Sequence, residues 1–171
     1  MGGLPSSRCG GISVGMTPTL FALLAALAPL VAMGSERVLG YAPCALCLWQ
    51  RWPYWVAVVL ALLAAAWPGG RRGLLALAVV AVLGSGAIAA LHVGVEQGWW
   101  PSPLASCLAP VSAGGATVDD LLAAMAPRPD KPCDAGAYPV PGLPLSFAAM
   151  NFCYALALGG LTLISLRRRQ A

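Results

Sequence analysis

Four long apolar runs without a charged residue constrain this chain more than any other feature. They cover residues 16–35, 52–70, 73–95 and, after three prolines, 145–166. A helix rises about 1.5 Å per residue, so about 20 apolar residues cross a bilayer core of about 30 Å. Backbone groups in lipid must be paired within their own segment, which a helix achieves. The runs predict an all-α membrane protein, a bundle of four transmembrane helices at about 17–35, 45–67, 73–93 and 145–166.

The composition excludes an ordinary soluble protein. Only 9% of the residues are charged and 59% are hydrophobic, whereas a soluble domain carries roughly 25% charged residues. A chain so poor in charge cannot cover a globule with a wetted surface. The formal net charge of +4 is a mild excess and does not indicate a nucleic-acid partner. The expected surroundings are therefore a lipid bilayer.

Basic residues set the expected orientation. Arg8 precedes the first run, Arg71 and Arg72 separate the second from the third, and arginines fill 167–169 after the fourth. Short loops rich in Lys and Arg stay in the cytoplasm. We therefore expect a membrane domain at 17–166 with both the extension 1–16 and the basic tail 167–171 cytoplasmic. A cleaved signal peptide is the alternative for the first run, which is longer than the usual apolar core of such a peptide.

The opposite side holds two loops, at about 35–43 and 94–144, and all six acidic residues. The long loop contains one expected helix, capped by Thr117 and ended by Pro127. Its apolar side chains recur with helical spacing at 118, 121, 122 and 125, which makes one stripe. This short amphipathic helix lies either on the bilayer surface or against the rest of the loop.

The six cysteines divide by compartment. Cys9 is cytoplasmic and Cys153 lies inside the fourth span, and neither is expected to have a role. The other four face the extracytoplasmic side, where an oxidising compartment lets them exist as disulfides. Cys44 and Cys47 form a C-x-x-C motif, and Cys107 and Cys133 are a widely spaced pair in the long loop.

The C-x-x-C motif lies where the second span begins. Pro43 suits the first position of a helix, and a spacing of three keeps both sulfurs on one face. A thiol at a helix N-terminus has a lowered pKa, and the thiolate is the nucleophile in disulfide exchange. Arg51 shares this face. Its nearest acids in sequence are Glu36 and Glu96, so no local salt bridge is expected, and Arg51 either stabilises a thiolate and a carbonyl oxygen or snorkels to the interface.

Other interpretations of the motif remain open. Haem attachment requires His directly after the second Cys, where Leu48 stands. A zinc site requires four good ligands, which His92 and the loop cysteines could complete, but no metal is expected here. A purely structural disulfide also remains possible.

The segment Pro43-Cys44-Ala45-Leu46-Cys47-Leu48-Trp49-Gln50-Arg51 resembles the P-C-x-L-C-x-x-x-R segment of the disulfide bond formation protein B family, DsbB. The run from His92 through Pro101-Ser102-Pro103 to Cys107 is similar to the family's approach to its loop cysteine, and Cys133 matches the second loop cysteine. The resemblance covers about 17–166. It implies a membrane thiol:quinone oxidoreductase of the bacterial inner membrane, with its active cysteines on the periplasmic side.

The resemblance also implies a relay. A reduced DsbA-like periplasmic partner with a thioredoxin fold attacks the Cys107–Cys133 disulfide, with Cys107 forming the mixed disulfide. Cys133 then exchanges with Cys44, and Cys47, beside Arg51, passes two electrons to the membrane quinone pool. The expected quinone is ubiquinone rather than menaquinone. His92 either lines the quinone pocket and moves protons or is a hydrogen-bonded interfacial histidine.

Two alternatives accompany this prediction. One is another quinone-linked enzyme, either a paralogue with a different partner or a vitamin K epoxide reductase-like protein. The other is a non-enzymatic four-span scaffold with a disulfide-stapled outer loop, which would leave Cys44, Cys47 and Arg51 unexplained.

Overall fold

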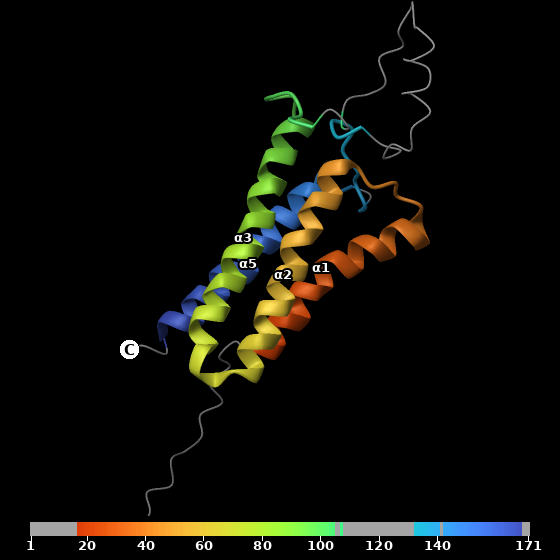
Figure 1. Ribbon diagram of the computed structural model, residues 1–171. Helices are drawn as coiled ribbons and strands as arrows, with labels where there is room; N and C mark the ends of the chain where they lie inside the picture. The colour runs from red at the N-terminus through yellow and green to blue at the C-terminus, as the bar shows by residue number, and fades with distance from the viewer. Residues whose placement is uncertain (1–16, 105–106, 108–131, 141, 169–171) are drawn as a thin grey trace, which may run out of the picture.

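The computed structural model describes residues 17–104, 107, 132–140 and 142–168, and within them the chain is all-helical. The long helices are α1 (Pro18–Leu39), α2 (Ala45–Ala66), α3 (Arg71–Glu96) and α5 (Phe147–Arg168), with a short 3₁₀ turn, η1 (Pro68–Gly70), before α3 (Figure 1). Each long helix is long and apolar enough to cross a membrane. The prediction of a four-helix membrane bundle is confirmed. The expected amphipathic helix after Thr117, and Cys9, lie outside the described residues.

The ends of α1 follow from local chemistry. The Thr17 hydroxyl accepts the Leu20 N–H at 3.2 Å, and Pro18 occupies the first helical position. Gly40, with φ of 69°, closes the helix in the left-handed conformation that glycine adopts at little cost. The helix therefore runs to Leu39 rather than to about Ser35. Charged Glu36 and Arg37 mark the edge of the apolar run, but they do not stop a helix.

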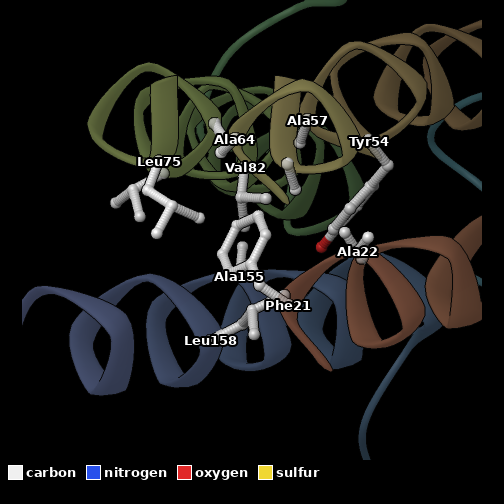
Figure 2. Packing of buried hydrophobic residues seen from close by; sticks show 13 residues of the cluster. Phe21, Ala22, Tyr54, Ala57, Ala64, Leu75, Val82, Ala155 and Leu158 are labelled. Carbon is white, nitrogen blue, oxygen red and sulfur yellow. The ribbon is translucent and has the colours of Figure 1, made fainter. Parts of the chain in front are cut away.

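The core of the bundle is built from small residues around a few large ones. Phe21 of α1, Tyr54 of α2 and Val82 of α3 are buried among alanines from all four helices (Figure 2). Gly86 of α3 lies so close to α5 that an added Cβ would be 3.0 Å from the Ala155 Cβ. Small residues let membrane helices approach closely, which is how such helices associate without a hydrophobic driving force.

The outer faces of the helices are apolar. Leu23 is 71% exposed and Val80 is 65% exposed, which suits contact with lipid rather than water. The bundle therefore has its polar chemistry at its two ends and inside it.

The two ends of the bundle differ in kind. At one end, α2 turns into α3 beside Arg71 and Arg72, and α5 finishes at Arg167 and Arg168 (Figure 1). At the other end, the start of α2 meets the end of α3, and the segments that carry Cys107 and Cys133 pack there. All four extracytoplasmic cysteines of the sequence analysis thus gather at the end opposite the arginines.

Candidate functional site

Four cysteines from three segments form one cluster. Cys107 and Cys133 are disulfide-bonded, and the Cys133 N–H donates to the Cys107 carbonyl at 3.2 Å. Cys44 and Cys47 are not bonded to each other, and their sulfurs lie 2.8 Å apart. Cys44 is buried and packs in the same apolar cluster as the loop disulfide. Cys153 is exposed on α5, away from this cluster.

Cys44 caps α2. Its sulfur accepts the Cys47 N–H at 3.2 Å, as an N-cap side chain does. The sequence predicts a lowered pKa for a thiol at this position, and for Cys44 this is wrong. The pKa of the Cys44 thiol is raised, because the thiol hydrogen-bonds to the Cys47 sulfur and because it is buried. These two effects outweigh the bond from the Cys47 N–H, which acts in the opposite direction.

His92 joins the two cysteine pairs. It is buried near the end of α3, where its Nε2 lies 3.5 Å from the Cys44 sulfur and 3.2 Å from the Cys133 carbonyl oxygen. One turn further on, a Glu96 carboxylate oxygen is 3.8 Å from the same nitrogen, and this carboxylate also accepts the Ser146 hydroxyl. The imidazole therefore contacts the Cys133 segment of the long loop and the thiol at the start of α2.

A chain of polar side chains continues from His92 into the bundle. Gln50 contacts His92 Nδ1 at 2.9 Å, and the Asn151 amide donates to Gln50 Oε1 at 2.8 Å. Tyr54 donates to Asn151 Oδ1 at 2.7 Å, and Ser85 donates to the Gln50 carbonyl at 2.7 Å. The sequence analysis missed this network. The available signal was the presence of amides in otherwise apolar helices, where polar side chains find partners on neighbouring helices.

Arg51 forms an ion pair with Glu36 of α1. From the sequence, no local salt bridge is expected for Arg51, and this expectation is wrong. It fails because α1 continues past Ser35 and carries Glu36 to α2. The pair uses the Arg51 Nη2. Arg51 Nε is buried and has no hydrogen-bond partner among the described residues.

A cavity of about 250 Å³ connects these groups. Its polar lining includes Cys44, Cys47, Arg51 and His92, so the structure brings four of the six predicted site residues to one space. Its apolar lining comes from α1 and α5, and includes Leu27, Val31, Phe147 and Met150. Cys107 and Cys133 do not line it and pack behind Cys44.

The family model described as disulfide bond formation protein DsbB matches residues 16–165. Comparisons with curated proteins and with solved structures find no match.

Proposed function

Since the chain belongs to the DsbB family of disulfide bond formation proteins, we propose that it re-oxidises a DsbA-like dithiol partner and passes the electrons to membrane quinone. The family is one of oxidoreductases that form disulfides and are generally linked to quinones. The chain is a multi-pass membrane protein by its four apolar helices. Its partner, its acceptor and the roles of its cysteines are the parts proposed here.

One observation carries the proposal. The C-x-x-C pair shares a largely apolar cavity with Arg51, whose Nε has no hydrogen-bond partner among the described residues, while the loop disulfide packs against the same pair. A site built this way offers one face to a soluble dithiol and another to a lipid-dissolved acceptor. A static scaffold disulfide requires neither face.

The exchange steps balance within the chain's own cysteines. A partner thiolate attacks the Cys107–Cys133 disulfide and forms a mixed disulfide with Cys107, which releases Cys133. Cys133 then attacks Cys44 of an oxidised Cys44–Cys47 pair, and Cys47 leaves as a thiolate. Closure of the partner's own disulfide frees Cys107, which displaces Cys44 from Cys133. The result is a Cys107–Cys133 disulfide with Cys44 and Cys47 reduced.

The cavity residues fit a quinone. Its apolar wall suits a ring and an isoprenoid tail, and Arg51 Nε could donate to a carbonyl oxygen. A bound quinone would accept two electrons and two protons. His92, 3.5 Å from the Cys44 sulfur, holds a proton where thiol chemistry releases or requires one.

The proposed location is the bacterial inner membrane, with the cysteine end facing the periplasm. Arg71, Arg72, Arg167 and Arg168 stand at the opposite end. Basic residues favour the cytoplasmic side, which supports this orientation.

The test is quinone reduction by the purified full-length protein in detergent. Reduced DsbA-like protein and ubiquinone are supplied, and the quinone absorbance is followed. Cys44→Ser and Cys47→Ser should abolish turnover in a folded bundle, whereas Cys153→Ser, a free cysteine outside the cluster, should retain it. Folded wild-type protein that turns over neither ubiquinone nor menaquinone would favour the scaffold alternative.

A further inference from the structure

Three ligands that suit a soft metal ion lie together at the start of α2. The Cys44 sulfur, the Cys47 sulfur and His92 Nε2 are all within 4.8 Å of one another. Thiolate and imidazole are the donors that Zn²⁺ and its softer relative Cd²⁺ prefer, whereas Mg²⁺ and Ca²⁺ prefer oxygen. In the proposed electron transfer the two thiols carry the electrons and His92 holds a proton, and the same three groups form a ligand set when the pair is reduced.

The spacing is close to that of a tetrahedral site. With Zn–S of about 2.3 Å and Zn–N of about 2.0–2.1 Å, a tetrahedral centre has an S···N edge of about 3.5 Å and an S···S edge of about 3.8 Å. The Cys44 sulfur lies 3.5 Å from His92 Nε2 and 2.8 Å from the Cys47 sulfur. One edge is therefore already in place, and the two sulfurs must separate by about 1 Å. Cys47 lines the cavity, which gives its side chain room to turn.

We propose that the dithiol form of the protein binds one thiophilic divalent cation, of the Zn²⁺ and Cd²⁺ class, through Cys44, Cys47 and His92. Binding replaces two thiol protons, which go to solvent. Two thiolates and one divalent cation sum to zero charge, so the filled site places no net charge at the membrane edge. The Cys133 carbonyl oxygen, 3.2 Å from His92 Nε2, or a water molecule can occupy the fourth position.

The redox state of the pair controls this site. A Cys44–Cys47 disulfide has no thiolate to offer, so only the reduced protein should bind the ion. A bound ion would in turn occupy both sulfurs and keep them from exchange. The site is thus a place where a thiophilic metal inhibits the protein, and binding itself requires neither quinone nor a partner.

Gln50 supports the histidine from behind. A metal on Nε2 requires the ring proton to be on Nδ1, where a ligating histidine normally donates it to a neighbour. The Gln50 side chain lies 2.9 Å from Nδ1. Turned over, which gives up the bond from the Asn151 amide to Gln50 Oε1, its amide presents an oxygen that accepts this proton. Replacing Gln50 by Glu, which accepts without turning over, should preserve or tighten binding, whereas Gln50→Leu should weaken it by about 10–100-fold.

The test is a Cd²⁺ titration of the full-length protein in detergent, followed by the thiolate-to-metal charge-transfer absorbance. The background carries serine at 9, 107, 133 and 153, so that Cys44 and Cys47 are the remaining cysteines. Reduced protein should bind one Cd²⁺ per chain, and oxidised protein none. Helical circular dichroism checks that the background is folded. If it is not, the reduced wild-type chain is titrated beside its His92→Ala variant.

His92→Ala distinguishes this site from a pair of thiols alone. We expect the affinity for Cd²⁺ to fall at least tenfold. Loss of a residue that only supports a ligand costs about 10–100-fold in other metal sites, and loss of the ligand itself should cost at least as much. An unchanged affinity in His92→Ala, a ratio of one ion to two chains, or equal binding by the oxidised protein would each overturn the proposal. None of these readouts depends on quinone turnover, so this inference and the proposed function can fail separately.

Discussion

Two nitrogens of the Arg51 guanidinium have different surroundings. Nη2 pairs with Glu36, while Nε is buried at the cavity without a partner among the described residues. Both partners of the ion pair are largely sheltered, with side-chain exposures of 15% and 23%. The pair fixes the guanidinium, and we propose that Nε then donates to the acceptor.

Arg51→Lys separates these two tasks. Lysine retains the positive charge for Glu36 but has no counterpart of Nε. A hydrogen bond from a charged group contributes about 1.5 kcal/mol or more, so KM for ubiquinone should rise roughly tenfold or more. Quinone titration of the turnover rate and thermal unfolding in detergent measure the two effects. An unchanged KM would show that Nε does not bind the acceptor.

Asn151 is the junction of the buried polar chain. It accepts from Tyr54 and donates to Gln50 and Ser85. Asn151→Leu should lower the free energy of unfolding by about 1–3 kcal/mol, because buried partners are left unpaired. Thermal unfolding checks this, with Ser165→Ala as the control, since among the described residues that hydroxyl bonds only to a carbonyl of its own helix. A loss no larger than that of the control would show that the network is not structural.

At the scale of the elements, α3 positions both His92 and the start of the long loop. Gly94 lies two residues past His92, and the Trp100 ring packs where its Cβ would be. The Trp100 indole N–H donates to the Leu91 carbonyl at 3.0 Å, which holds the chain leaving α3 against that helix. A close approach of this kind requires glycine.

Gly94→Ala should therefore displace Trp100 and destabilise the end of α3 by about 1–3 kcal/mol, the usual cost of overpacking. Gly84→Ala is a matched control on the same helix, because an added Cβ there meets nothing within 4 Å. Thermal unfolding of the two variants in detergent measures the difference. Equal melting temperatures would mean that the ring moves aside without cost.

The sequence predicts the helices better than it predicts their side-chain partners. The apolar runs that mark α1, α2, α3 and α5 are local properties of the sequence, so the four-helix bundle follows directly from them. The helix ends do not, since α1 continues through Glu36 to Gly40. That extension creates the ion pair with Arg51, 15 residues away, and the Gln50–Asn151 bond joins residues 101 apart. Contacts of this range depend on how whole helices pack, and no spacing within one segment encodes them.

At the scale of the whole molecule, the two ends of the bundle carry different chemical groups. Cys44, His92 and the loop disulfide gather at one end, and the four arginines of the α2–α3 turn and the end of α5 stand at the other. The proposed thiol exchange with a soluble partner would require the first end to face an oxidising compartment. The positive charges favour the cytoplasm for the second. The two considerations are independent and give the same orientation.

Two tryptophans test this orientation as a matched pair. Trp67 lies at the arginine end and is 67% exposed, and Trp99 lies at the cysteine end and is 68% exposed. Each is replaced singly by Cys in a background with Cys9→Ser and Cys153→Ser, and intact cells are treated with a membrane-impermeant maleimide. Trp99→Cys should be labelled in intact cells, and Trp67→Cys only after the membrane is permeabilised. The background alone gives the baseline from the site cysteines. Because the two positions are equally exposed, labelling in the reverse order would mean that the bundle is inserted the other way round, with its thiols in the cytoplasm and no access to a periplasmic partner.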